Sequence, residues 1–155
     1  MDMLNKKLIL EVAFILAFIA LLIASIFIIF IRDIGTTSRE LERAQKTDII
    51  RVETPRINEA ITSPLIISGE ARGTWFFEAS FPARLLDASG NEIAVMPVTA
   101  QEEWMTEDFV SFYAILEFEA PASQNGTLIF EKDNPSGLPQ YADKLEIPVK
   151  FFAAP

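Results

Sequence analysis

The chain contains no cysteine and no histidine among its 155 residues. Without cysteine it has no disulfide, no thiol nucleophile and no redox pair. Without histidine it lacks the usual general base, the Ser-His nucleophile pair and the commonest zinc ligand. Carboxylates, lysines and hydroxyls remain, but the sequence arranges them in no catalytic motif. We therefore predict a protein that is not an enzyme and that carries no cofactor and no metal ion.

Positive charge is also scarce. The chain has 13 lysines and arginines against 22 acidic residues, a net charge of −9. Residues 1–47 are almost balanced, with six basic and five acidic side chains, whereas residues 48–155 carry seven basic and seventeen acidic ones. An acidic surface repels phosphate backbones, so we expect no nucleic-acid partner. The asymmetry predicts two parts with different surroundings.

One long apolar run stands near the N-terminus. Residues 12–31, VAFILAFIALLIASIFIIFI, contain a single polar residue, Ser25. As a helix the run spans the hydrocarbon core of a bilayer, at ~1.5 Å per residue. A small domain has no room to bury a helix that is apolar on every face, and the run lacks the cleavage site of a signal peptide. We predict a signal anchor that contacts the lipid bilayer through Val12–Ile31, after a short N-terminal segment, residues 1–11.

Residues 32–48 form the predicted spacer. Thr37 and Glu40 have the spacing of a capping box, and the following RELERAQK is rich in helix formers. Only Leu41 and Ala44 are apolar, too few for the seam of a coiled coil. We expect a short helical stalk.

Beyond the spacer the hydrophobic pattern changes to a period of two. In residues 111–119, SFYAILEFE, the residues Phe112, Ala114, Leu116 and Phe118 fall on one face, which is typical of a strand that covers a core. Turn residues separate several such runs. The predicted strands are 49–54, 64–72, 74–87 with a break near Pro82, 92–100, 110–119, 127–132 and 145–152. About seven short strands without a strong helix predict an all-β, immunoglobulin-like β-sandwich over residues 49–153.

Four stretches of the β region are distinctive: SPLIISGEARGTWFFEASFPARLLDASGNEI, EEWMTEDFVSFYAILEF, FEKDNPSGLP and EIPVKF. Together they resemble the bacterial spore-germination immunoglobulin-like domain family. This family occurs beside the GerMN domain in germination lipoproteins and also in envelope proteins of bacteria that form no spores. The resemblance covers about residues 50–152 and implies an extracytoplasmic domain. The chain would then cross the cytoplasmic membrane once, with its N-terminus on the cytoplasmic side.

Aromatic residues supply the candidate binding site. On a strand Trp75 and Phe77 share one face, with Trp104 and Phe109 in a nearby loop. The preferred prediction is that these aromatics belong to the core, because a small sandwich without a disulfide needs the large areas that they bury. An exposed docking surface is the alternative. Beside them, Glu78 is expected to pair with an arginine, Arg72 or Arg84, or to accept backbone N–H groups of the loop.

The stretch Asp133-Asn134-Pro135-Ser136-Gly137 is a candidate turn. Asp and Asn accept local backbone N–H groups, Pro fixes φ and Gly137 is expected at positive φ. A calcium site is the alternative, but one acidic residue supplies too few of the six to eight oxygens that calcium takes, unless the acidic loop 102–108 joins it. The turn is the preferred prediction.

These features predict a membrane-anchored, extracytoplasmic, non-enzymatic binding module whose partner is an envelope protein or a cell-wall polymer. The alternative is a structural subunit of a membrane complex that is held through its transmembrane helix. Small residues at three- to four-residue spacing on that helix allow close helix packing. They are Ala13, Ala17, Ala20 and Ala24.

Overall fold

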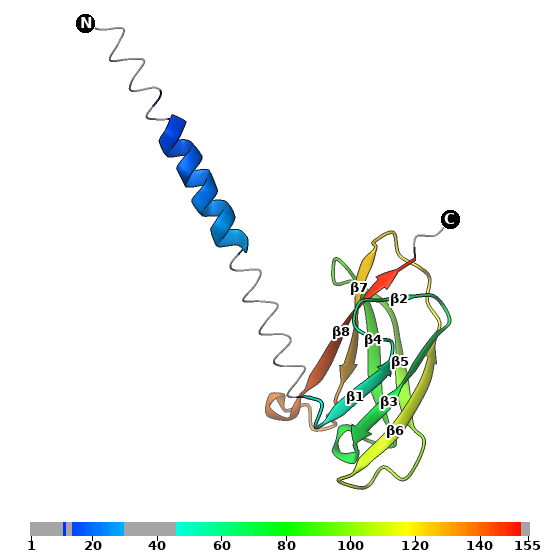
Figure 1. Cartoon of the computed structure of the whole chain (residues 1–155). Helices are drawn as coiled ribbons and strands as arrows, with labels where there is room; N and C mark the ends of the chain where they lie inside the picture. The colour runs from blue at the N-terminus through cyan, green and yellow to red at the C-terminus, as the bar shows by residue number, and fades with distance from the viewer. Residues whose placement is uncertain (1–10, 12–13, 30–45, 153–155) are drawn as a thin grey trace, which may run out of the picture. The chain divides into compact units, whose positions relative to one another are not determined.

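The protein is described by a computed structural model that covers residue 11, residues 14–29 and residues 46–152. Its contacts divide the chain into two compact units, Met1–Ala44 and Gln45–Pro155. Figure 1 shows a helix in the first unit and a β domain in the second. The two units are described separately below.

In the first unit, residues 14–29 form an α-helix, and the hydroxyl of Ser25 donates to the carbonyl oxygen of Leu21 at 2.9 Å. Within the described residues no helix is both long and apolar enough to cross a bilayer. Residues 12–13 and 30–31 of the predicted span, and residues 32–45 of the predicted stalk, lie outside the described residues.

The β domain contains the seven predicted strand regions and one further strand. The additional strand, β2, has only three residues and pairs in parallel with β8, so its pattern is too short to find in the sequence. The strands are β1 (Ile50–Thr54), β2 (Glu59–Ile61), β3 (Leu65–Arg72), β4 (Ser80–Asp87), β5 (Glu92–Ala100), β6 (Phe109–Leu116), β7 (Asn125–Glu131) and β8 (Lys144–Phe151).

The strands form a curled sheet with the order β1-β3-β6-β5-β4-β7-β8-β2. Strand β5 pairs with β4 over most of its length, but with β6 only through Thr99 and Ala100. It therefore joins two layers, β1-β3-β6 and β5-β4-β7-β8-β2, which Figure 1 shows facing each other. The order agrees with the neighbours in an immunoglobulin-like sandwich, and the predicted β fold is confirmed at this level.

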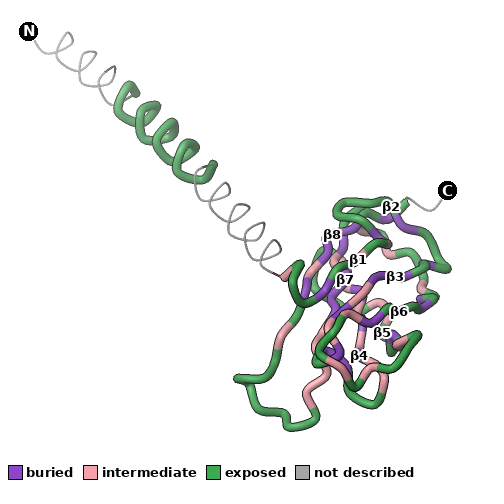
Figure 2. Tube along the Cα trace, turned by 60° about the horizontal axis from the view of Figure 1, so that its bottom comes forward, coloured by how far each residue is buried: buried purple, intermediate pink, exposed green. Residues whose placement is uncertain are grey.

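The core lies between the two layers. On β6, Phe112, Ala114 and Leu116 are buried as the alternation predicts, while Phe118 lies beyond the strand and is half-buried. Buried and exposed residues alternate along most strands in Figure 2. At the centre, the Phe81 ring is fully buried and lies 5.2 Å from the Phe112 ring and 6.3 Å from the Phe130 ring, centroid to centroid. Packed aromatic rings thus occupy the centre of the core, where antibody domains have an inter-sheet disulfide that this cysteine-free chain cannot form.

The predicted strand 74–87 is wrong in its first half. Residues Gly73–Trp75 form a turn of 3-10 helix and strand β4 starts only at Ser80. The break that was predicted near Pro82 lies before Ser80 instead, and Pro82 itself is inside β4, opposite Pro97 of β5. Two prolines fit opposite each other in a pair that exchanges no hydrogen bonds, and the pairing of β4 with β7 begins one residue later, at Ala83.

Candidate functional site: three loops at one end of the β domain

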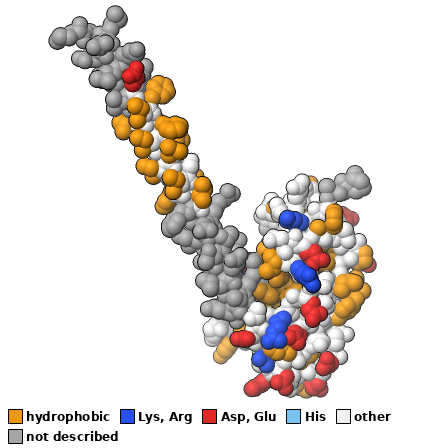
Figure 3. All heavy atoms as spheres, viewed as in Figure 1, with side chains coloured by type: hydrophobic (Ala, Val, Ile, Leu, Met, Phe, Trp, Pro, Cys, Tyr) orange, Lys and Arg blue, Asp and Glu red, His pale blue; other side chains and the backbone are white. Residues whose placement is uncertain are grey.

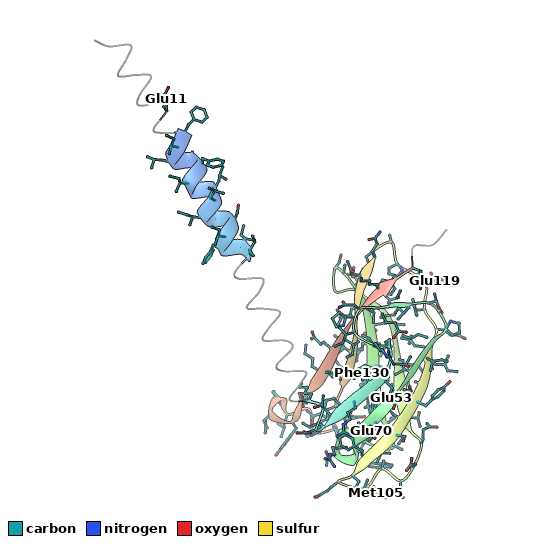
Figure 4. All side chains as sticks on the ribbon, viewed as in Figure 1. Glu11, Glu53, Glu70, Met105, Glu119 and Phe130 are labelled. Carbon is teal, nitrogen blue, oxygen red and sulfur yellow. The ribbon has the colours of Figure 1, made fainter. Side chains whose placement is uncertain are left out.

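Three loops meet at one end of the β domain. They follow β3, β5 and β7 and comprise residues 73–79, 101–108 and 132–143; we call this region the loop end. Backbone hydrogen bonds join them: Gly73 N–H donates to Asp108 O at 3.1 Å, and Asp133 N–H donates to Trp75 O at 3.1 Å. Figure 4 shows Met105 at the extremity of this end. Loops carried in this way by paired strands have a fixed geometry.

Gly73 allows the second loop to lie directly on the first. A Cβ at this position would come within 2.1 Å of Thr106 O and 2.2 Å of Trp104 O. Only glycine leaves room for these two carbonyl groups, so the sequence GTW after β3 determines where residues 104–106 lie.

An open groove of about 460 Å³ runs between the first two loops. Phe76 and Trp104 contribute rings, and Met105 is 74% exposed at the rim. The lining residues are Gly73, Thr74, Phe76, Trp104, Met105, Thr106 and Glu107. The groove is mostly apolar, with Glu107 as its charged member.

The four predicted aromatic candidates have different environments. Trp75 is fully buried, so the core prediction is confirmed for this residue and a docking surface does not include it. Phe77 is 40% exposed, and Trp104, which is half-buried, is the only one of the four that lines the groove. The sequence pattern missed Phe76, because the 3-10 turn breaks the alternation on which the expected face was based.

Phe109 is half-buried beneath two arginines. The guanidinium carbons of Arg51 and Arg72 lie 3.9 Å and 4.1 Å from the centre of its ring, within the range of cation–π contacts. Arg72 also donates to the carbonyl oxygens of Asp48 and Glu107, at 3.0 Å and 3.2 Å. Phe109 is therefore a structural residue beside the groove, and Arg72 ties the second loop to the start of the domain.

The expected ion pair of Glu78 is absent from the described residues. Arg72 binds the backbone carbonyls just named, and Arg84 binds Glu131 at 2.9 Å and Glu92 at 2.6 Å. These hydrogen bonds, first to Glu131, raise the pKa of Arg84. Glu78 instead lies exposed at the tip of a turn.

That turn has an unusual backbone. Phe77 and Ser80 exchange N–H···O bonds of 3.0 Å and 3.1 Å around the two residues Glu78 and Ala79. Both central residues have positive φ, 49° and 61°, the pattern of a type I′ turn that Asn-Gly normally occupies. Left-handed backbone costs ~1–2 kcal/mol for each L-residue with a Cβ, so tertiary contacts maintain this tip. One such contact is the bond of 2.9 Å from Ala100 N–H to Ala79 O.

The third loop contains the predicted turn. Gly137 has φ of 65° and its N–H donates to Asn134 O at 3.0 Å, with Pro135 second in the turn. The Asn134 side chain donates to Leu138 O at 2.9 Å, and Asp133 contributes its backbone N–H to the bond with Trp75. Over the described part of the chain, no three acidic side chains come together in a group that could hold a metal ion.

The loop end is strongly acidic. Its one basic residue is Lys132, and Figure 3 shows acidic side chains gathered at this lower end of the domain. Lys46, at the start of the domain, pairs with Asp143 at 2.6 Å. The acidic residues of the three loops are Glu78, Glu102, Glu103, Glu107, Asp108, Asp133 and Asp143.

Comparison with protein families gives one match. Residues 49–137 match the model of Gmad2, the immunoglobulin-like domain of bacterial spore germination. The matched region covers β1 to β7 and ends at the turn of the third loop; β8 follows and pairs with β7 in the same sheet. No curated protein and no solved structure matches the chain.

Proposed function

Because the chain belongs to the Gmad2 family of immunoglobulin-like domains, we propose that it is a non-enzymatic binding module that contacts its partner through the loop end. The observation that carries this proposal is the apolar groove beside Trp104 and Met105. Immunoglobulin-like domains place loops from several strands together at one end, and loops on a rigid scaffold often carry binding residues. Met105 and Phe77 present apolar side chains to solvent there.

The strained turn supports the same assignment. Glu78 and Ala79 keep positive φ values although neither is glycine or asparagine. Strained backbone persists where surrounding contacts maintain it and is frequent at binding sites. Here it fixes the exposed Phe77 next to the groove residue Phe76.

We also propose that residues 12–31 anchor the protein in the cytoplasmic membrane and that the β domain lies outside. The length and apolar character of this run support an anchor. The absence of native cysteine allows a direct test. A cysteine at Ala122, which is exposed, should react with a membrane-impermeant maleimide on intact cells, whereas one at Asn5 should react only after lysis. Labelling of both positions only after lysis would contradict the proposed topology.

Site-specific photo-crosslinking in cells tests the binding function. A benzophenone amino acid at Met105 should capture a partner, while the same group at Val95 should not. Val95 is a matched control because it is 47% exposed and lies within β5, outside the loop end and its groove. Capture from Ala17 in the helix, with none from Met105, would refute binding at the loop end. It would instead support a structural subunit held through its transmembrane helix.

A further inference from the structure

The carboxylates around the groove lack ionic partners among the described residues. Glu102, Glu103, Glu107 and Asp108 form no ion pair there, in contrast to Asp143 with its lysine. Among the described residues, the Glu103 carboxylate accepts the N–H of Met105, at 3.2 Å. The second loop therefore presents four carboxylates within seven residues, around an apolar groove.

The nearest cation does not balance this charge. The guanidinium of Arg72 binds two backbone carbonyls and lies on the Phe109 ring. Arg51, on the same ring, is paired with Glu70 at 2.6 Å. Both are engaged with other groups, and no described lysine or arginine, Lys132 included, forms an ion pair with residues 102–108, so this rim keeps its negative charge.

The groove itself takes a small apolar group. It is an open groove of about 460 Å³, and Phe76 and Trp104 are among its lining residues. One or two side chains of a peptide fit such a volume. Together, an apolar lining and an acidic rim require a ligand with an apolar anchor and positive charge around it.

We infer that the loop end binds a cationic segment of a protein partner, with an apolar side chain in the Phe76–Trp104 groove and lysines or arginines against the rim. The inference rests on the proposed binding function, and of the two partners expected from the sequence, an envelope protein and a cell-wall polymer, it favours the protein. Anionic cell-wall polymers meet like charge at this rim and are excluded from the groove.

The test uses the full chain in non-ionic detergent micelles and two fluorescent ten-residue peptides. One carries four lysines around a central Phe-Leu pair, and the other carries glutamates in place of the lysines. Poly(glycerol phosphate) serves as the anionic polymer. Fluorescence anisotropy measures Kd at low and at physiological ionic strength, with the polymer assayed by competition.

Two triple variants with equal net charge separate site binding from general attraction. E102Q/E103Q/E107Q neutralises the rim, and E53Q/E117Q/E119Q removes three exposed carboxylates elsewhere on the domain. Figure 4 shows that Glu119 lies at the end of the domain opposite Met105. The rim variant should raise the Kd of the lysine peptide about tenfold, equivalent to about 1.4 kcal/mol of binding free energy, and the control variant should raise it less than about twofold. Met105→Ser should also weaken it, at both ionic strengths, because that contact is apolar.

Equal weakening by both triple variants, or no binding of the lysine peptide, would overturn the inference. Tighter binding of the glutamate peptide or the polymer than of the lysine peptide would also overturn it. If Met105→Ser abolishes that tighter binding, the loop end is still a binding site. The proposed function then stands, and only the charge of the ligand was assigned wrongly. Capture from Met105 in cells is a separate readout, so the two proposals fail independently. Thermal melts of each variant, followed by tryptophan fluorescence, check that the domain is folded.

Discussion

Three consecutive aromatic residues, Trp75, Phe76 and Phe77, offer a sharp test of the packing. Their exposed fractions are 0%, 4% and 40%. Trp75 and Phe76 contact the central ring of Phe81, with ring centroids 6.4 Å and 5.1 Å away. We predict that truncation of these neighbours to alanine has very different effects, although they are adjacent in sequence and similar in size.

Trp75→Ala and Phe76→Ala should each lower the free energy of unfolding by ~3–5 kcal/mol, the range for emptying a buried aromatic site. Phe77→Ala should lower it by about 1 kcal/mol or less, because much of that ring is already in water. The free energy of unfolding of a whole domain is only ~5–15 kcal/mol, so either core variant should lose a large share of it. Trp75→Phe should be milder than Trp75→Ala. It keeps a ring and removes the indole N–H, which is buried and has no hydrogen-bond partner among the described residues.

Guanidinium denaturation of the full chain in non-ionic detergent, followed by tryptophan fluorescence, measures these differences. Both tryptophans lie in the β domain, so the signal reports that unit alone, and Trp104 remains as a probe when Trp75 is replaced. If Phe77→Ala lowers the free energy of unfolding as much as Trp75→Ala does, the assignment of Trp75 to the core and Phe77 to the surface is refuted. An unchanged midpoint in Trp75→Ala would refute it as well.

Three other predictions use the same denaturation assay. Ala79→Gly should raise stability by about 0.5–1 kcal/mol, since glycine adopts φ of 61° without the Cβ clash but adds unfolded-state entropy. Gly73→Ala should lower stability by ~1–3 kcal/mol, because the new Cβ collides with Trp104 O. The Asp87 carboxylate accepts hydrogen bonds, first from the Asn91 side chain, which lower its pKa. Its contribution to stability is therefore present above the unfolded-state pKa and is lost as pH falls through the lower folded-state pKa, and Asp87→Asn should lack this acid-dependent component.

Each of these three predictions has an outcome that would contradict it. The alanine-to-glycine change at exposed Ala122, which has no positive φ, should lower stability, and equal effects at both positions would remove backbone strain as the cause at Ala79. A Gly73→Ala variant as stable as the parent would show that residues 104–106 shift without cost. Parallel pH profiles for Asp87→Asn and the parent would show that the hydrogen bonds of this turn do not distinguish the two protonation states.

Sequence patterns with a local cause predicted much of this protein. The period of two placed Phe112, Ala114 and Leu116 on the core face, since strand geometry alone decides which residues alternate. The turn at Asn134–Gly137 followed from proline and glycine backbone preferences. The family resemblance agreed with the match over residues 49–137.

Tertiary structure decided the remainder. The pattern of TWFFEAS favours a strand, yet Gly73 contacts the second loop, and the bond from Ala100 N–H to Ala79 O helps to hold a turn of non-glycine residues at positive φ. These contacts come from distant parts of the chain and outweigh local propensity, so Phe76 rather than Phe77 enters the core. The groove depends on the same contacts, because Phe76 and Trp104 become neighbours only when β3 and β6 pair. No pattern within either loop carries that information.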